Sequence, residues 1–265
     1  MSQTNAAFVT GGTGALGRAV TRRFLDDGYA VAVTFRNPKE WEEVREASAR
    51  EAEAGRLLGI SADVTDFDST GAAVAQAAAA FGGLRVLAHV AGGYAGGTPV
   101  ETIEAKAVRQ MLDLNLASAF WAARHVIPHA KASGRGRLLF ISSRGALEAS
   151  AGAAAYAASK AGLHALVATL AKEVGSSGAT ANAVLPSVID TPQNRAAMPN
   201  AQFETWVAPA QVAALLAFLA SDSAATTSGA LIPITRKRTS NSCATGNPLG
   251  APSVRGAASA TKKSP

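Results

Sequence analysis

The chain has 265 residues, of which 48% are hydrophobic and 17% are charged, a composition that excludes a largely disordered protein. The 25 Lys and Arg residues exceed the 19 Asp and Glu residues, which by itself suggests a nucleic-acid or anionic-membrane partner. All of that excess lies after Ile234, and removing the six basic residues found there leaves 19 of each sign. We therefore expect no basic binding face on the folded part and no nucleic-acid partner. The six residues are Arg236, Lys237, Arg238, Arg255, Lys262 and Lys263.

Other features of the sequence favour an ordinary cytoplasmic protein. The one cysteine, Cys243, cannot form an internal disulfide, and the first residues lack the pattern of a signal peptide. The longest uncharged apolar stretch, 206–221, is shorter than the roughly 18 apolar residues that a membrane span needs. We expect no membrane association. We also expect no metal site, because His125 and His129 have no evident third ligand.

Short apolar runs alternate along the chain with longer segments in which apolar residues recur every three or four positions. This alternation predicts an α/β fold of Rossmann type, a doubly wound parallel sheet of about seven strands with helices on both faces. The predicted strands cover residues 6–10, 30–34, 57–61, 85–90, 137–141, 180–185 and 230–234. The predicted helices lie near residues 15–27, 39–53, 68–81, 101–131, 154–176 and 209–220.

The alternation stops near the end of the chain. Residues 1–234 form one predicted domain. Residues 235–265 are rich in Ser, Thr, Ala, Gly and Asn and show no periodicity, so we expect a basic, disordered tail. In parallel sheets of this kind, ligands bind beyond the carboxyl ends of the strands, which is where motifs are expected.

The turn after the first predicted strand, Thr10–Gly17, is rich in glycine and leads directly into a helix. Glycines bring backbone N–H groups close to a pyrophosphate, whose charge the helix N-terminus favours. A tight turn without a ligand is the alternative. The predicted cofactor contacts in this turn are Gly11, Thr13, Gly14, Ala15, Leu16 and Gly17.

The spacing of Thr10, Gly11, Ala15 and Gly17 resembles the cofactor loop of the short-chain dehydrogenase/reductase family, which usually has glycine in place of Ala15. The resemblance implies an NAD(P)-binding Rossmann domain with oxidoreductase activity. It also implies a homodimer or homotetramer, assembled through the two longest predicted helices and the last strand.

The second predicted strand ends with no carboxylate and with one arginine, Arg36. A carboxylate at this place would accept a hydrogen bond from the ribose 2′-hydroxyl, whereas an arginine pairs with a 2′-phosphate. We therefore expect NADP(H) to be preferred and NAD(H) to be possible. A solvated surface arginine is the alternative interpretation.

The resemblance assigns further cofactor contacts to residues that follow the next strands. Asp63 and Val64 are expected to contact the adenine, unless an aspartate there only caps the following helix. Ala91 and Gly92 match the end of the family pattern Asn-Asn-Ala-Gly, near the nicotinamide ribose. The asparagines are absent, and His89 stands in place of the first. Support for that strand must then come from elsewhere, and His89 is expected to be structural rather than catalytic.

Two contacts are expected after the sixth predicted strand. In the family, residues at the positions of Ile189 and Thr191 contact the nicotinamide carboxamide and the phosphates. Ser187 replaces a glycine of the family pattern and restricts the backbone there. The alternative for Thr191 is that it caps a helix beginning at Pro192.

Tyr156 and Lys160 stand four residues apart in a predicted helix, which places both side chains on one face. A free phenol has a pKa near ~10, too high for a base at neutral pH, and a neighbouring ammonium would lower it. Tyr156 can then act as general acid and base towards an alcohol oxygen, and Lys160 can also hold the nicotinamide ribose.

Ser143 and Asn115 complete the predicted catalytic group. Ser143 precedes Tyr156 by 13 residues and ends the fifth predicted strand, where its hydroxyl can hold a carbonyl oxygen. Its neighbour Ser142 fits the spacing less well. The resemblance implies that Asn115 kinks its helix and holds a water in a proton relay to Lys160.

These residues predict an NADP(H)-dependent oxidoreductase that transfers hydride between nicotinamide and a carbonyl or alcohol substrate. The segments 90–97 and 190–206 also resemble dihydropteridine reductases, which typically carry an acid after the second strand and lack the catalytic serine. A quinonoid pterin is thus an alternative substrate, and a non-catalytic dinucleotide-binding protein is an alternative function. The segment 193–203 is expected to be a short loop that shapes the substrate pocket, and it carries no distinctive chemistry.

Overall fold

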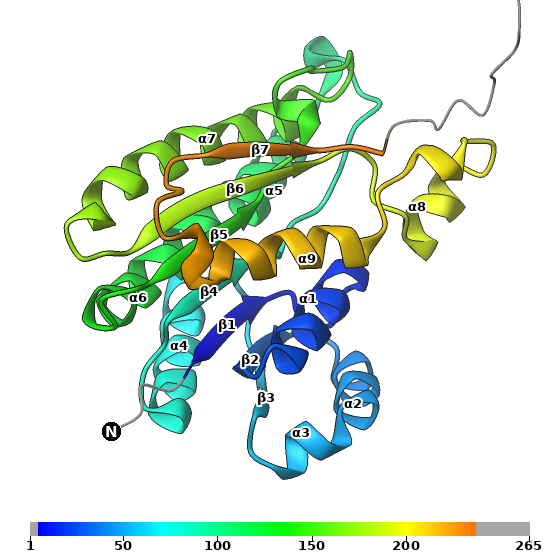
Figure 1. Ribbon diagram of the computed structural model, residues 1–265. Coiled ribbons are helices and arrows are strands. Elements are labelled where there is room, and N and C mark those ends of the chain that lie inside the picture. The colour runs from blue at the N-terminus through cyan, green and yellow to red at the C-terminus, as the bar shows by residue number, and fades with distance from the viewer. Residues whose placement is uncertain (1–4, 237–265) are drawn as a thin grey trace, which may run out of the picture.

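The computed structural model describes residues 5–236, which contain a seven-stranded parallel sheet. The strand order is β3-β2-β1-β4-β5-β6-β7, so the direction of winding reverses between β1 and β4 (Figure 1). The predicted doubly wound sheet is confirmed. The strands are β1 (Ala6–Thr10), β2 (Ala30–Phe35), β3 (Leu57–Ser61), β4 (Val86–His89), β5 (Arg137–Ile141), β6 (Thr180–Pro186) and β7 (Leu231–Ile234).

Helices and short turns connect the strands. The helices are α1 (Ala15–Asp26), α2 (Pro38–Ala47), α3 (Ala49–Glu53), α4 (Phe67–Phe81), α5 (Ala105–Leu112), α6 (Ser118–Ala132), α7 (Ala154–Gly175), α8 (Pro192–Ala197) and α9 (Pro209–Ala220). A π-helical turn, Asp113–Ala117, joins α5 to α6. Short 3-10 turns lie at Val100–Thr102, Arg144–Ala146, Phe203–Thr205 and Asp222–Ala224.

Three predicted segments differ from the structure. The helix predicted over 39–53 is divided at Ser48, because serine competes with the backbone for hydrogen bonds and disfavours helix interiors. The helix predicted over 101–131 is interrupted by the π-turn between α5 and α6. The segment 193–203 is not only a loop, since it contains most of α8.

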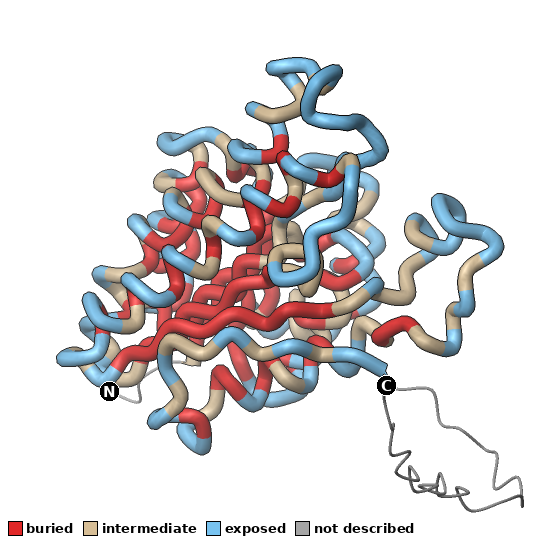
Figure 2. The backbone as a smooth tube through the Cα atoms, turned by 90° about the horizontal axis from the view of Figure 1, so that it is seen from above, coloured by how far each residue is buried: buried red, intermediate tan, exposed pale blue. Residues whose placement is uncertain are grey.

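Alternate residues along each strand point to opposite faces of the sheet, and both faces are covered. Ala6 and Phe8 of β1 pack under α4, α6 and α7, whereas Ala7 and Val9 pack under α1, α2 and α9 (Figure 1). The central strands β1, β2, β4, β5 and β6 therefore form the buried centre of the molecule (Figure 2), whereas the edge strand β7 is exposed or half-buried. This arrangement leaves the carboxyl ends of the strands and the loops that follow them to build a site.

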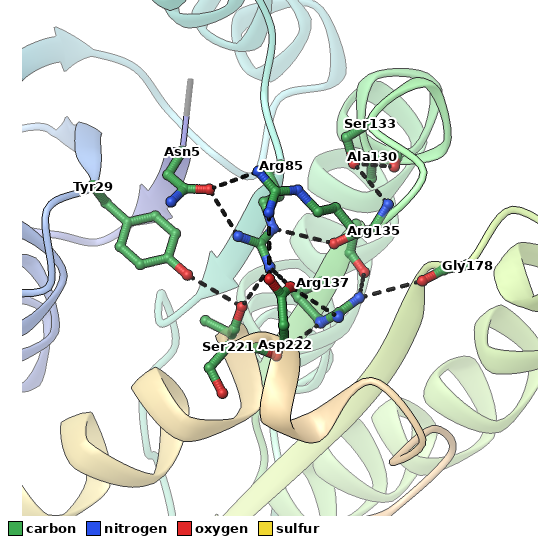
Figure 3. A network of polar contacts seen from close by, with 12 residues as sticks. Asn5, Tyr29, Arg85, Ala130, Ser133, Arg135, Arg137, Gly178, Ser221 and Asp222 are labelled. Atoms are coloured by element: carbon green, nitrogen blue, oxygen red, sulfur yellow. Dashed lines mark hydrogen bonds and ion pairs between the residues drawn. The ribbon is translucent and has the colours of Figure 1, made fainter. Parts of the chain in front are cut away.

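An arginine cluster holds the opposite, amino-terminal edge of the sheet (Figure 3). Arg85 and Arg137, at the starts of β4 and β5, are 4% and 1% exposed, and both form ion pairs with Asp222, just after α9. Arg135 pairs with the same carboxylate at 3.3 Å, and Asn5 accepts hydrogen bonds from Arg85 and Arg135. The cluster ties the end of α9 to the sheet.

Two expectations concern the whole chain. No helix in residues 5–236 is long and apolar enough to cross a membrane. The predicted tail, 235–265, lies outside the described residues except for its first two positions. The division of the chain at Ile234 stays a prediction.

Candidate active site

The turn between β1 and α1 has no room for side chains at Gly11 and Gly17. Gly11 has a φ of +64°, and a Cβ there would lie 3.0 Å from the Ala91 Cα. A Cβ on Gly17 would lie 2.0 Å from the Gly11 carbonyl oxygen. Gly14 is the N-cap of α1 and Ala15 is its first residue, both exposed. The bare backbone next to a helix N-terminus fits a dinucleotide pyrophosphate.

The other two predicted residues of this turn are buried. Leu16 is 9% exposed and packs in the core, so only its backbone can face a ligand. The Thr13 hydroxyl donates a hydrogen bond to the Glu40 carboxylate at 3.0 Å. The turn of residues 10–17 between β1 and α1, the proposed phosphate turn, is therefore bonded directly to the first turn of α2.

Glu40 is a residue that the sequence-based search missed. The expected place for an acid is the end of the second strand, whereas Glu40 lies four residues after Arg36. A signal was present, because Asn37 and Pro38 form a helix start that places Glu40 in the first turn. Arg36 itself is exposed at the end of the β2 region. The site thus has both a basic and an acidic residue near the place where the adenosine ribose is expected.

The two aspartates after β3 have different partners. Asp63 Oδ1 accepts hydrogen bonds from the N–H and the hydroxyl of Thr65, at 2.9 and 2.7 Å. These bonds, with a contribution from Arg36, lower the pKa of Asp63. Asp66 caps α4 by accepting a hydrogen bond from the Ser69 N–H at 2.7 Å. The helix cap is therefore Asp66, and Asp63 is left in an exposed turn.

The loop after β4 runs over two of the predicted catalytic side chains. A Cβ on Gly92 would lie 2.9 Å from Asn115 Oδ1 and 3.0 Å from Lys160 Nζ. Asn115 Oδ1 accepts a hydrogen bond from the Gly93 N–H at 2.9 Å, and its Nδ2 donates to the Gly93 carbonyl at 3.0 Å. The structure therefore places Gly92 beside Asn115 and Lys160, and Ala91 against Gly11.

Asn115 lies at 0% exposure in the π-turn between α5 and α6. The interruption implied by the family resemblance is thus present at this residue. Its Nδ2 also donates to Ser159 Oγ at 3.1 Å, and Ser159 donates to the Tyr156 carbonyl at 2.7 Å. Asn115 therefore links the loop after β4 to α7. Ser159 was missed in the sequence, although it lies between Tyr156 and Lys160.

Tyr156 is half-buried on α7 and lies between two hydroxyl-bearing side chains. Burial raises its pKa above the ordinary value of 10, the adjacent Ser143 hydroxyl opposes that shift, and Tyr94 adds to it. The Tyr94 ring meets the Tyr156 ring edge-on, with 4.9 Å between the centroids. Tyr94 is 68% exposed, so an aromatic side chain covers the catalytic candidate from the solvent side.

The prediction that the Lys160 ammonium lowers the pKa of the Tyr156 phenol is wrong in this structure. Lys160 is 4% exposed and donates a hydrogen bond to the Ile141 carbonyl at 2.8 Å. Burial lowers its own pKa to about 8. Burial of the phenol is the dominant effect on Tyr156, whose pKa is raised and not lowered.

The two serines after β5 point in different directions. Ser142 Oγ donates to the Lys160 carbonyl at 3.1 Å and lies 2.9 Å from His164 Nε2, within the core side of α7. Ser143 Oγ accepts a hydrogen bond from the Gly145 N–H at 3.0 Å and lies beside Tyr156. The geometry therefore favours Ser143 as the partner of Tyr156.

The residues after β6 lead into the short helix α8, and side-chain hydrogen bonds hold the start of that helix. Thr191 is the N-cap of α8 and accepts a hydrogen bond from the Asn194 N–H at 3.1 Å, so the helix-cap interpretation is confirmed. The Asn194 side chain donates to the Ile189 carbonyl at 2.8 Å. Because Thr191 Oγ1 accepts this bond, its hydroxyl hydrogen is still available to donate to a cofactor.

No group of three His, Cys, Asp or Glu side chains within residues 5–236 is placed to hold a metal ion. His125 packs its ring 4.6 Å from the Phe67 ring. The histidine pair considered in the sequence therefore has one member in an aromatic contact between α4 and α6.

Comparison with known proteins agrees with this geometry. A family model described as short chain dehydrogenase matches residues 5–202. The 2-dehydro-3-deoxy-L-rhamnonate dehydrogenase (NAD(+)) of Sphingomonas sp. (strain SKA58) is 33% identical over 187 residues, 70% of this chain and 72% of that protein. The cis-4-hydroxycyclohexanecarboxylate dehydrogenase of Sinomonas cyclohexanicum is 32% identical over 236 residues, 86% and 94% of the two chains.

A solved structure shows the same relationship. The short-chain type dehydrogenase/reductase from Mycobacterium ulcerans superposes with a TM-score of 0.82 at 27% identity, and the match covers 88% of each chain. The chain belongs to the short-chain dehydrogenase/reductase family and is an oxidoreductase acting on CH–OH or C=O groups.

Proposed function

We propose that the protein is an NADP(H)-dependent enzyme that transfers hydride between nicotinamide and a carbonyl or alcohol substrate. One observation carries this function most directly. Ser143 lies beside the Tyr156 phenol, while Lys160 and Asn115 lie against Gly92 in the loop after β4. A proton donor for a carbonyl oxygen and a surface for a dinucleotide are thus adjacent.

Tyr156 is the general acid and base of the proposed reaction. A bound nicotinamide would supply or accept the hydride. In reduction, the phenol donates its proton to the carbonyl oxygen, and its raised pKa keeps it protonated at neutral pH. The Ser143 hydroxyl holds the same oxygen by a hydrogen bond. The carbon gains a hydride and the oxygen gains a proton, which yields the alcohol.

Lys160 and Asn115 act on the cofactor side. The Lys160 ammonium spends one hydrogen on the Ile141 carbonyl and has two more that can bond ribose hydroxyls. Asn115 holds the backbone of the loop at Gly93. The proposed cofactor contacts are Gly11, Thr13, Gly14, Ala15, Leu16, Gly17, Arg36, Asp63, Val64, Ala91, Gly92, Tyr156, Lys160, Ile189 and Thr191.

The proposed cofactor preference follows from two charges near the phosphate turn. Arg36 is exposed and supports NADP(H), because a guanidinium pairs well with a 2′-phosphate. Glu40, bonded to Thr13, repels a second phosphate and supports some use of NAD(H). One relative is named as an NAD(+) enzyme. We expect NADP(H) to be preferred and NAD(H) to be accepted.

A quinonoid dihydropterin is a second candidate substrate. The exposed ring of Tyr94 stands edge-on to Tyr156 and offers a face to a planar ring held at the phenol. One relative is named for a cyclohexane-ring alcohol, which supports cyclic substrates more generally. Unspecified ketones and alcohols stay the first candidates.

A reductase assay tests this function. The purified protein is mixed with NADPH or NADH and a panel of linear ketones, cyclic ketones and quinonoid dihydropterin, and loss of absorbance by the reduced cofactor is followed. We expect turnover of at least one carbonyl, faster with NADPH. NADPH binding without turnover across the panel would support the alternative, a non-catalytic dinucleotide-binding protein, and would contradict the enzyme function.

Assembly and location belong to the same proposal. Phe120 on α6 is 46% exposed, and Leu112 on α5 and Leu231 on the edge strand β7 are each 36% exposed. These side chains support a homodimer or homotetramer formed through the long helices and β7. Light scattering after size-exclusion chromatography should give twice or four times the mass of one chain. A cytoplasmic location stays a prediction.

A further inference from the structure

His89 ends β4 and lies in the middle of a buried chain of hydrogen bonds. It is 1% exposed, and both nitrogens of its ring have partners on other elements. Nδ1 lies 3.0 Å from Thr10 Oγ1 at the end of β1, and Nε2 lies 3.2 Å from Ser118 Oγ at the start of α6. One side chain thus joins the strand before the phosphate turn to the helix after Asn115.

The direction of each hydrogen bond follows from the partners. Ser118 Oγ donates its one hydrogen to the Leu114 carbonyl at 2.6 Å, so towards His89 it can only accept. His89 Nε2 therefore carries the ring hydrogen. In the neutral ring Nδ1 is then the acceptor, and it takes the hydroxyl hydrogen of Thr10.

Thr10 completes the chain on the side of the cofactor loop. Its Oγ1 accepts hydrogen bonds from the N–H groups of Val90 and Ala91, both at 3.1 Å, while its hydrogen goes to His89. These two amides begin the loop whose next residue, Gly92, lies against the proposed catalytic group. The position of that loop therefore depends on the state of the imidazole.

At its other end the chain of hydrogen bonds reaches Leu114, in the π-turn that carries Asn115. We propose, on the basis of the function proposed above, that His89 is a positioning residue whose neutral, Nε2-protonated ring holds the cofactor loop and the π-turn in one fixed relation. Asn115 then meets Gly93 in the geometry that the loop requires. An asparagine in place of His89 can reach the Thr10 hydroxyl but ends short of Ser118.

The surroundings of His89 keep the ring neutral. Burial lowers its pKa to about 3, and the Lys160 ammonium on α7 adds to that shift. The other groups that contact the ring are uncharged. They are the Thr10 hydroxyl from β1, the Ser118 hydroxyl from α6 and the Phe140 ring from β5, whose centroid is 6.1 Å from that of His89. The acceptor at Nδ1 is therefore available throughout the pH range of an enzyme assay.

Kinetics and NADPH binding separate positioning from simple packing. His89→Phe keeps an aromatic ring and removes both hydrogen bonds, so we expect the NADPH dissociation constant to rise and kcat to fall, each by about tenfold. His89→Asn should recover the dissociation constant, because it keeps an acceptor for Thr10, but not kcat. His125→Phe is the matched control: the buried Nε2 of His125 has no hydrogen-bond partner in the described part of the chain, so both constants should stay unchanged.

Several outcomes would overturn this role. One is that His89→Phe and His125→Phe have the same NADPH dissociation constant and the same kcat. Another is that His89→Asn binds NADPH no more tightly than His89→Phe does. If His89→Phe does not fold, Ser118→Ala can be used instead. It removes the hydrogen bonds from Ser118 to His89 and Leu114 but keeps the bond between His89 and Thr10, so it should lower kcat alone. If the wild type binds NADPH but turns over no carbonyl, the proposed function fails, while the dissociation constants of these variants still decide the role of His89. A wild type that binds no NADPH contradicts both.

The pH dependence of stability gives a readout that needs no activity. The folded pKa of about 3 lies below the ordinary value of 6.5, so between these pH values the unfolded chain holds a proton that the folded protein does not. The stabilisation by the neutral ring is complete above pH 6.5 and is lost as the pH falls towards 3. As the pH falls, we expect the free energy of unfolding to fall more steeply in the wild type than in His89→Asn. Parallel pH dependences in the two proteins would contradict a buried, neutral His89 ring.

Discussion

Asn115 and Gly93 form a reciprocal pair of hydrogen bonds: Oδ1 of Asn115 accepts from the Gly93 N–H at 2.9 Å, and Nδ2 donates to the Gly93 carbonyl at 3.0 Å. Both backbone groups of one residue are thus held by one buried amide. Gly93 lies directly between Gly92, on the cofactor side, and Tyr94, which covers Tyr156. The pair therefore sets the position of the loop on both sides of the proposed reaction centre.

Asn115→Ala should lower kcat/KM by roughly 30-fold, because two buried hydrogen bonds of about 1 kcal/mol each are lost where the loop meets the cofactor. Steady-state kinetics measure this effect. Asn182→Ala is a matched control: Asn182 is also 0% exposed and also bonds two backbone groups, of Thr227 and Ala230, beside β7. It should lower the melting temperature and leave kcat/KM unchanged. Equal kinetic losses in the two variants would contradict the proposed role of Asn115.

Cofactor choice should respond in opposite directions to changes at Arg36 and Glu40. Arg36→Ala should raise the KM for NADPH by about tenfold and leave that for NADH unchanged, because a guanidinium–phosphate pair is lost. Glu40→Gln should raise the preference for NADPH, because a carboxylate bonded to the phosphate turn is neutralised. Arg50→Ala, an exposed arginine on α3, serves as the control. An equal change of both KM values in Arg36→Ala would argue against a 2′-phosphate contact.

The two directions of the reaction should differ in their pH dependence. Because burial raises the pKa of Tyr156, the phenol is protonated at neutral pH and is ready to donate in carbonyl reduction. Alcohol oxidation needs the phenolate, whose fraction grows as the pH rises. We expect kcat for reduction to be flat around neutrality and kcat for oxidation to increase steadily into the alkaline range. A plateau of the oxidation rate below about pH 8 would show that the pKa is lowered instead.

Asp222→Asn should destabilise the fold, because this one carboxylate pairs with Arg85, Arg135 and Arg137 at the amino-terminal edge of the sheet (Figure 3). The expected loss in the free energy of unfolding is about 1 kcal/mol, a reduced figure because the Asp222 side chain is largely exposed. Urea unfolding measures it. Glu42→Gln, which breaks one exposed pair with Arg45, should change the free energy of unfolding far less. Equal effects would contradict a structural role for the cluster.

Much of the fold follows from local patterns. The central strands are buried on both faces and appear as short apolar runs, as in Ala6–Thr10, whereas the helices bury one stripe each. Both patterns can be recognised in the sequence. The break at Ser48 and the π-turn around Asn115 cannot. A single serine does not by itself fix where a helix breaks. The π-turn depends on residues distant in sequence, because Asn115 bonds to Gly93 and His89 lies against Ser118, the residue after the turn.

In the candidate site, too, some features can be predicted from the sequence and others depend on the tertiary structure. The spacing of Tyr156, Lys160 and Ser143 can be recognised in the sequence, because it depends on one helix and the strand before it. The raised pKa of Tyr156 and the bond from Lys160 to Ile141 depend on burial and tertiary distance. The bond from Thr13 to Glu40 depends on tertiary distance in the same way, since the two residues lie 27 positions apart.

The central claim is that Tyr156 exchanges the proton in hydride transfer, and Tyr156→Phe tests it most directly. The variant loses only the phenolic hydroxyl, so we expect NADPH binding, measured by fluorescence, to stay near that of the wild type. Carbonyl reduction should fall by about 100- to 10,000-fold. Tyr29→Phe, which loses a hydroxyl bonded to the Ala220 carbonyl far from the site, should keep full activity. Wild-type turnover by Tyr156→Phe would contradict the claim.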